Sequence, residues 1–445
     1  LLDMNLEIMT RKRFKFEAFW VKAEGFMETV QAAWDSTPVA SNNYLTLQNK
    51  LRATAVSLQK WSNRWIGNVK LQISIALEVI KQLDVAMESR QLADAERDLR
   101  RRLKRKLLGL CSLERTIARQ RSRLLQLREG DGSTRLFHQQ ASHGQRKNVL
   151  KSVKYNGAIH SGQEEVASAV DAYYGRAFGT VEPRSYTLNL QGLDLPHLDL
   201  SQLEVAFTME EVENVIKDMP PDRAPGPDGF TGRFYAKCWN IIKVDFMKAM
   251  DCFYNGDMRG LAAINKSLVT LLPKMDGALD VGDFRPINLV HGAIKIFEKV
   301  LACRLVVHLP QLVGNHQSAF VKGRSLHDNF MLVQSMARRL NALRMPSVLL
   351  KLDILKAFDS VQWPFLLEVM QQMGFGPRWR SWICGILSTS TTKVMVNGDP
   401  GDTIYNCKGL RQGDPISPML FILTMEPLQR LFQRATTSGV LEPLA

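Results

Sequence analysis

The chain has 445 residues, enough for two or three domains, and an ordinary hydrophobic content of 45%, so it can bury a sizeable core. Its formal net charge of +14 at pH 7 favours a polyanionic partner, with nucleic acid ahead of a membrane surface. The six cysteines lie far apart without a CxxC pair, which argues against a zinc site, and no apolar run approaches the roughly 18–20 residues that span a bilayer.

Residues 1–140 are expected to form a mainly α-helical, basic region. Leu103, Leu110, Ile117 and Leu124 recur every seven residues, a pattern that predicts packing against another helix, within the chain or between two chains. Residues 96–148 hold 15 Lys and Arg against 5 Asp and Glu, so one helix face could follow phosphates or simply be solvated. The candidate nucleic-acid-binding residues here are Arg100, Arg101, Arg102, Lys104, Arg105, Arg121 and Arg123.

Residues 141–205 alternate short apolar runs with polar turns and are expected to connect the basic region to the C-terminal half of the chain. From about residue 206 helices alternate with short strands, which indicates an α/β or α+β fold. One helix should begin near Thr208, because Thr208 and Glu211 form a capping box: the hydroxyl covers a free N–H and Glu211 reaches back.

A strand with one buried face is predicted over residues 348–353, where Val348, Leu350 and Leu352 alternate with other residues. Asp353 ends this strand. A carboxylate on a rigid element is the oxygen ligand that Mg²⁺ prefers, and phosphoryl transfer to a nucleotide needs such ions. Taken alone, an aspartate at the end of a strand more often makes a turn or a cap.

A polar loop between glycines is predicted over residues 409–416. Gln412 offers a donor and an acceptor to a nucleotide, and Gly413 lets the backbone approach a ligand closely. Ser417 is expected to cap the following helix, with Pro418 at its first position. A plain loop before a helix is the alternative.

Arg285 is the candidate phosphate-binding residue of a third segment, Asp283–Asn288, because a guanidinium can grip phosphate with two parallel donors. A surface salt bridge is the alternative. The segment 225–229 (PGPDG) is typical of a stiff turn without chemistry of its own.

Together these stretches resemble the reverse transcriptases of non-LTR, LINE-type retrotransposons, those of plants most of all. In chain order they are DRAPGPDGFTGRFY (222–235), LLPKMDGALDVGDFRPINLV (271–290), NHQSAFVKGRSLHDNFMLVQ (315–334), LLKLDILKAFDSVQWPFLL (349–367) and KGLRQGDPISPMLF (408–421). A basic stretch, RQRSRLLQLREGDGSTRLFH (119–138), resembles the segment upstream of that polymerase domain. The resemblance implies the α+β fold of a right-hand polymerase, with fingers at about 206–345 and a partial palm at about 346–445, preceded by the helical basic region.

The resemblance also implies roles for individual residues. Asp353, with the backbone oxygen of Ile354, would ligate two catalytic Mg²⁺ ions. Phe358 would lie under the incoming sugar and exclude a 2′-hydroxyl. Gln412 would contact the incoming nucleotide or the primer end, and Arg285 would hold the triphosphate.

Part of the family's machinery is not found in this sequence. Such polymerases carry a Tyr/Phe-Ala-Asp-Asp turn downstream of the Gln-Gly loop, and this sequence contains no Asp-Asp pair. Both ends look cut, so the thumb and the upstream endonuclease are expected to lie outside it. One carboxylate cannot hold two Mg²⁺ ions in place, and this chain alone is therefore expected not to extend a primer.

The leading hypothesis is a fragment of an RNA-directed DNA polymerase, whose partners would be an RNA template, a DNA primer and deoxynucleoside triphosphates. One alternative is a nonenzymatic nucleic-acid-binding remnant of a retroelement, and another is a pseudogene product without a stable fold. We expect the protein inside the cell, in the nucleus and in cytoplasmic RNA–protein particles, without membrane association or secretion. No oligomeric state is predicted by these patterns.

Overall fold

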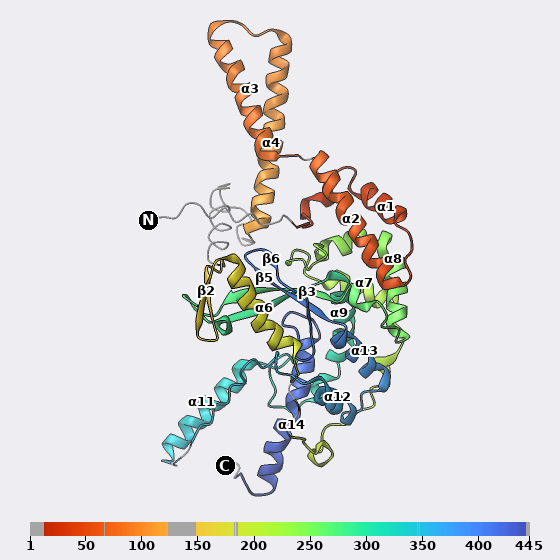
Figure 1. The fold of residues 1–445 in the computed structure, drawn as a ribbon, viewed down its shortest axis with the longest axis vertical. Helices are drawn as coiled ribbons and strands as arrows, with labels where there is room; N and C mark the ends of the chain where they lie inside the picture. Colours follow the sequence, from red (N-terminus) through yellow and green to blue (C-terminus); the bar gives the residue numbers. More distant parts are fainter. Residues whose placement is uncertain are drawn as a thin grey trace.

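The computed structural model describes a molecule of mixed helices and strands. The described residues are 13–65, 67–122, 148–181, 183, 186–344, 346 and 348–441. Helices surround a small central sheet, and one long helical hairpin projects from this body (Figure 1). None of the helices in these ranges is both long enough and apolar enough to cross a bilayer.

The N-terminal aromatic segment belongs to the main hydrophobic core. It contains η1 (Ala18–Lys22), α1 (Phe26–Ser36) and α2 (Asn43–Trp65), which pack on α8 (Gly232–Tyr254). Phe16 packs edge-on against Phe234 with ring centroids 5.6 Å apart, and its backbone N–H donates to the carbonyl of Gly229 at 2.9 Å. The first part of the chain therefore folds onto the 225–229 turn and on α8.

The projecting hairpin consists of α3 (Val69–Ser89) and α4 (Asp94–Ser122), which pack against each other. On the predicted seam of α4, Leu110 is buried and Leu103 and Ile117 are half-buried. The partner of the seam is thus a helix of the same chain, one of the two arrangements left open by the sequence. Leu124 lies outside the described residues.

The central sheet has the strand order β4-β3-β5-β6, with β7 also paired to β5. Its strands are β3 (Lys266–Pro273), β4 (Phe284–Val290), β5 (Thr391–Val396), β6 (Asp399–Pro400) and β7 (Ile404–Tyr405). β3 is antiparallel to β4 and parallel to β5. Alternate side chains, among them Val269, Leu271 and Val394, face a second core under α6 (Gln163–Gly179), which follows the hairpin β1 (Ser152–Tyr155) and β2 (Ala158–Ser161).

The remaining helices cover the rest of the body. They are η2 (Leu190–Leu193), η3 (Ser201–Glu204), α7 (Met209–Asp218), η4 (Leu261–Ala263), η5 (Val281–Asp283), α9 (Gly292–Val306), α10 (Leu309–Leu312), α11 (Leu326–Ala342), α12 (Trp363–Gln372), α13 (Pro377–Ser388) and α14 (Ser417–Thr437). The predicted capping of α7 is half correct, because the Thr208 hydroxyl accepts from the Glu211 N–H at 3.2 Å. The Glu211 carboxylate does not reach back. It takes two N–H donors of Arg304 in α9 at 2.7 Å each, a stronger pairing than a single backbone N–H offers.

The strand predicted over residues 348–353 is wrong for this structure. The segment has no regular secondary structure, and Val348, Leu350 and Leu352 are 95%, 72% and 61% exposed. A strand needs a neighbour for its backbone groups, and no strand among the described residues pairs with this segment.

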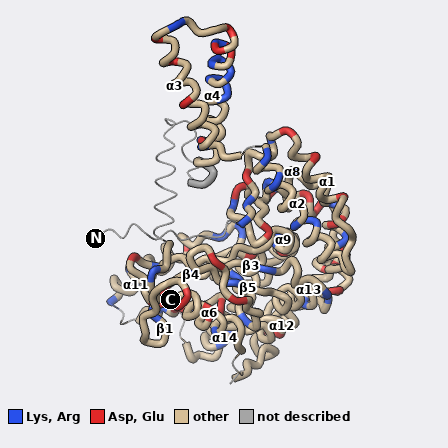
Figure 2. Tube along the Cα trace, turned by 45° about the horizontal axis from the view of Figure 1, so that its top comes forward, with Lys and Arg blue, Asp and Glu red and all other residues tan. Residues whose placement is uncertain are grey.

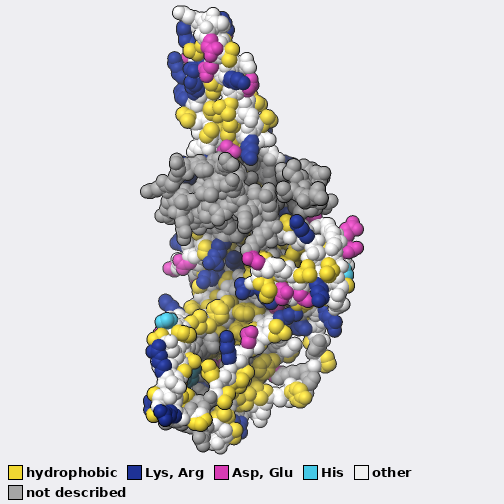
Figure 3. Space-filling view, turned by 90° about the vertical axis from the view of Figure 1, so that its left-hand side faces the viewer, with side chains coloured by type: hydrophobic (Ala, Val, Ile, Leu, Met, Phe, Trp, Pro, Cys, Tyr) yellow, Lys and Arg dark blue, Asp and Glu magenta, His cyan; other side chains and the backbone are white. Residues whose placement is uncertain are grey.

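Helix α11 has no buried residue. The lower half of the face drawn in Figure 3 is largely hydrophobic.

Gly226 should be intolerant of a side chain, because a Cβ there would lie 2.1 Å from the carbonyl oxygen of Val290, a backbone atom that cannot move aside. We predict that Gly226→Ala lowers the free energy of unfolding by at least about 2 kcal/mol in urea denaturation. Gly109→Ala is the control, since nothing lies within 4 Å of that Cβ and alanine favours the helix by about 1 kcal/mol. Equal stability of the two variants would contradict the tight contact between the 225–229 turn and β4.

Candidate functional site

The loop 409–415 is fastened to the turn 356–361 by backbone hydrogen bonds. The N–H groups of Gly409 and Leu410 donate to the carbonyls of Val361 and Phe358, each at 2.8 Å. The indole N–H of Trp363 donates to the Gly409 carbonyl at 2.7 Å. Two of the segments singled out in the sequence, one containing Phe358 and the other Gln412, are therefore neighbours.

The same loop is also fastened to strand β4. The Asn288 N–H donates to the Gln412 carbonyl at 2.9 Å. Gly413 has a φ of +124°, and a Cβ there would lie 2.7 Å from the Asn288 carbonyl oxygen, so only glycine fits. The predicted cap of the next helix is wrong by one position: Ile416 is the N-cap, and buried Ser417 lies in the first turn beside Pro418.

Arg411 is buried in the base of this loop between two carboxylates. Its Nη2 donates to Glu298 of α9 at 2.7 Å, and its Nε donates to Asp414 at 2.6 Å. The side chains of Arg411, Glu298 and Asp414 are 8%, 0% and 5% exposed. These charges are removed from water, which is costly unless they pair with each other.

The residues next to the loop also hold each other. The ring of Phe358 stacks on Phe421 of α14 with centroids 4.7 Å apart and planes 16° from parallel. Burial raises the pKa of Asp359 to about 6, against the lowering effects of Lys356 and of a hydrogen bond with the Gln412 side chain. The Lys356 ammonium lies 4.6 Å from the ring centre of Tyr173 in α6. Phe358 and Gln412 are thus part of one packed unit.

Behind the loop, the sheet has a polar core. The Ser267 hydroxyl donates to Asn288 at 3.1 Å and lies 3.0 Å from the Thr392 hydroxyl. The amide of Asn406 donates to Thr392 at 3.1 Å and to Ser390 at 2.9 Å. Asn288, Ser390, Thr392 and Asn406 line a cavity of about 20 Å³ that has room for one water molecule. Asp359, Arg411 and Asp414 also line it.

The other predicted site residues are exposed, and no hydrogen bond or ion pair among the described residues joins their side chains to this packed unit. Arg285 lies exposed on β4, opposite Leu272, and no ion pair links it to another described residue. Asp353 and Ile354 are exposed in the segment without regular structure. The structure therefore organises the loop of Gln412 and the ring of Phe358, whereas Asp353 has no supporting strand.

A two-metal site is not formed by the described residues. No group of three or more His, Cys, Asp or Glu side chains in these ranges could hold a metal ion. Mg²⁺ needs oxygen ligands held on rigid elements. Asp353 is not on a strand, and it belongs to no cluster of metal-ligating side chains among the described residues. The residues present do not fit a pair of Mg²⁺ ions in this arrangement.

The basic residues of α4 are distributed along the projecting hairpin (Figure 2). Arg100 is bound to Asp84 of α3 at 2.6 Å, and Arg101 lies 3.6 Å from Asp98. Arg102, Lys104 and Arg105 are exposed. Arg121 is in the last turn of α4, and Arg123 lies outside the described residues.

The sequence reasoning missed the role of Glu298. A signal was present, because Glu298 falls on the apolar face of α9, four residues after Ile294 and three before Leu301, both fully buried. A lone carboxyl group on such a face needs a buried partner, and Arg411 donates to it at 2.7 Å. Asn288 was within a segment of interest, but its backbone bond to Gln412 is not visible from sequence.

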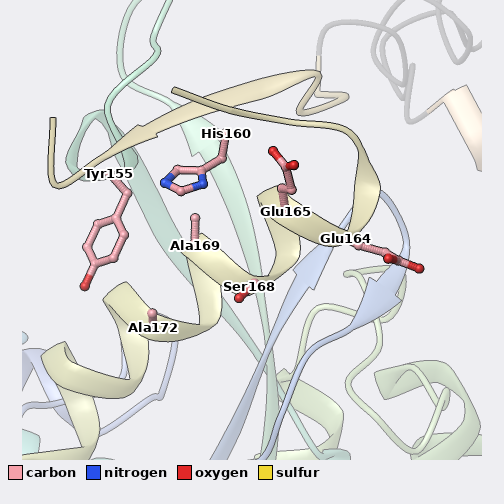
Figure 4. Close-up of a pocket in the computed structure, with 7 residues that line it drawn as sticks. All are labelled: Tyr155, His160, Glu164, Glu165, Ser168, Ala169 and Ala172. Atoms are coloured by element: carbon pink, nitrogen blue, oxygen red, sulfur yellow. The ribbon is translucent and has the colours of Figure 1, made fainter. Parts of the chain in front are cut away.

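A larger surface depression lies elsewhere, between the β1–β2 hairpin and α6. Tyr155, His160 and Glu165 are among the side chains around it (Figure 4), and its volume is about 420 Å³. None of the predicted site residues lines this depression. Its chemistry is that of an open, solvated surface, and the packed loop remains the candidate site.

Part of the chain matches a known protein family. Residues 272–441 match the family described as reverse transcriptase (RNA-dependent DNA polymerase). This range contains Arg285, Phe358 and Gln412 as well as Glu298 and Arg411. All the contacts of the loop described above lie within it, apart from those to α6 and to Ser267.

Several retrotransposon proteins are similar to the chain. It is 24% identical over 439 residues to the transposon TX1 uncharacterized 149 kDa protein of Xenopus laevis, covering 96% of this chain and 33% of that protein. A Pol polyprotein from retrotransposable element R2 of Nasonia vitripennis is 30% identical over 46% of this chain and 20% of its own length. The RNA-directed DNA polymerase from mobile element jockey of Drosophila melanogaster is 25% identical over 48% of this chain and 24% of that protein. The chain thus spans a third or less of these relatives.

Asp359 should make folding stability depend on pH. Its pKa in the folded chain is raised to about 6, so its neutral form favours the fold below pH 4, and this contribution is lost as the pH rises through 6. We predict that the free energy of unfolding falls by on the order of 2–3 kcal/mol through this group between pH 4 and pH 7, and that Asp359→Asn removes this component. Urea denaturation at several pH values measures it, with exposed Asp251→Asn as the control. Identical pH profiles for wild type and Asp359→Asn would exclude the effect.

Proposed function

We propose that this chain, which carries a non-LTR retrotransposon reverse transcriptase domain over residues 272–441, is the nucleotide-selecting part of an RNA-directed DNA polymerase. Its substrates would be deoxynucleoside triphosphates, paired to an RNA template at the end of a DNA primer. The observation that carries the proposal is the packed unit of the loop 409–415, the Phe358 ring and strand β4. Two segments about 50 residues apart in sequence meet there with a strand from a third.

The unit has the properties that a nucleotide-selecting surface needs. Phe358 is a bulky ring that cannot easily turn away, because Phe421 stacks on it, and a fixed ring can exclude a 2′-hydroxyl by bulk. Gln412 is held at its carbonyl by Asn288, and its side chain lies beside Asp359. The guanidinium of Arg285 is exposed on the adjacent strand β4 and can bind a triphosphate.

The proposal assigns parts of the polymerase to parts of the chain. The fingers would comprise about 206–345 and a partial palm about 346–445, after a helical basic region (1–140) and a connecting region (141–205). Asp353 and Ile354 would belong to a two-Mg²⁺ site whose other ligands these residues do not provide. We place the protein in the nucleus and in cytoplasmic RNA–protein particles.

A second candidate function is nonenzymatic binding of nucleic acid. It is favoured by the exposed basic residues Arg102, Lys104 and Arg105 on the hairpin and by the lack of a supporting strand at Asp353. Binding of this kind depends on phosphate charge and carries no base specificity. One polymerase can have both functions. A binding measurement distinguishes them, because the first function requires that the chain bind nucleotide as well as RNA, whereas the second requires RNA alone.

The chain alone should not extend a primer. One exposed carboxylate, Asp353, cannot hold two Mg²⁺ ions, so the leaving pyrophosphate and the attacking hydroxyl would not be stabilised. We expect no incorporation above background on an RNA template with a DNA primer, magnesium and all four deoxynucleotides. An active reverse transcriptase in the same buffer is the control. Robust incorporation by the purified 445-residue chain would overturn the prediction.

Charge reversal on the hairpin should weaken RNA binding. In the triple variant Arg102→Glu, Lys104→Glu and Arg105→Glu, contacts to about three phosphates are lost, so affinity should drop at least about tenfold at 0.15 M salt and depend less steeply on salt. The control reverses Lys60, Lys217 and Lys237, exposed lysines on α2, α7 and α8, with the same change in net charge. Fluorescence anisotropy with labelled RNA over a salt series compares them, and equal losses in both variants would argue against the hairpin as the binding surface.

A further inference from the structure

The buried cluster of Glu298, Arg411 and Asp414 joins two pieces of the molecule, helix α9 and the loop 409–415. Glu298 is on helix α9, which follows strand β4, whereas Arg411 and Asp414 flank the Gln412-Gly413 pair. All three side chains are more than nine-tenths buried, and the two donor–acceptor distances are 2.7 and 2.6 Å. The loop is thus held to helix α9 by the Arg411–Glu298 contact and to strand β4 by the Asn288–Gln412 backbone bond.

The cluster holds two carboxyl groups against one guanidinium, so full ionisation would leave a buried net negative charge. Burial and the neighbouring Asp414 carboxyl raise the pKa of Glu298 well above its ordinary value. Burial lowers the pKa of Arg411, but Asp414 and Glu298 raise it by more. The arrangement that costs least is a charged Arg411–Asp414 pair with a neutral Glu298, in which the carboxyl groups share one proton.

The direction of the side chains connects this cluster with the proposed nucleotide surface. Along the loop, Arg411 and Asp414 point into the core, while Gln412 between them is partly exposed and lies beside Asp359. Gly413 leaves no room for a side chain against Asn288. A movement of Arg411 would therefore move the adjoining backbone and with it the amide of Gln412.

We propose that Glu298 is a positioning residue, which fixes Gln412 for contact with nucleotide by clamping Arg411 from beneath the loop. This inference rests on the proposed function only in the statement that Gln412 contacts a nucleotide. The clamp itself is a property of the cluster. A neutral glutamine at 298 can still accept from Arg411 and bond to Asp414, whereas alanine leaves the guanidinium with Asp414 alone.

Hydrogen exchange of the full chain tests the clamp directly. The amide of Asn288 is the reporter, because its N–H donates to the Gln412 carbonyl although it is part of a different element. Glu298→Ala should speed exchange in peptides covering 284–290 and 409–416 about tenfold, and should weaken binding of dGTP about tenfold. Glu298→Gln should stay within about twofold of wild type in both measurements.

Arg304→Gln is the matched control, since Arg304 is on the same helix and forms a part-buried ion pair with Glu211 that does not touch the loop. It should lower the melting temperature without changing exchange at Asn288. Unchanged exchange in folded Glu298→Ala, or equal loosening in Arg304→Gln, would overturn the inference. Should Glu298→Ala fail to fold, Arg411→Lys keeps the charge but cannot grip both carboxylates, and must loosen the loop. Absence of dGTP binding by wild type would count against the proposed function, while exchange still decides the clamp.

Discussion

A single buried guanidinium imposes the main constraint on this site. Arg411 must be neutralised inside the protein, and its two partners come from α9 and from its own loop. Once these contacts form, the Gln412 carbonyl meets Asn288 and the loop meets the turn that contains Phe358. The backbone position of the loop thus depends on an interaction whose side chains are more than nine-tenths buried.

Sequence patterns predicted the fold best where they reflect local physics. The heptad of Leu103, Leu110 and Ile117 indicated a packed helix, and the hairpin supplies its partner. Thr208 indicated the start of α7 correctly, because a hydroxyl cap depends only on neighbouring residues. Glu211 was assigned to the same cap wrongly, since the pattern contains no information on Arg304, which is 93 residues away.

The candidate site shows the same division between local and distant effects. The glycines and Gln412 could be interpreted as a ligand-facing loop from their composition, and the family resemblance assigned both Phe358 and Gln412 to the incoming nucleotide. The strand over 348–353 could not be settled by alternation, because a strand is stable only with a neighbour and none of the described strands adjoins it. The polar core of Ser267, Asn288 and Thr392 was equally invisible, since its members come from three strands.

Gly413 has a consequence for interpreting degenerate copies of such genes. Its φ of +124° and its closeness to the Asn288 carbonyl oxygen exclude every other residue for reasons of folding alone. A copy that no longer synthesises DNA but still has to fold would therefore keep the glycine, and with it the outward appearance of the Gln-Gly motif. Presence of that motif in a genome marks an intact loop, and an inventory of working elements has to be based on the metal-binding carboxylates instead.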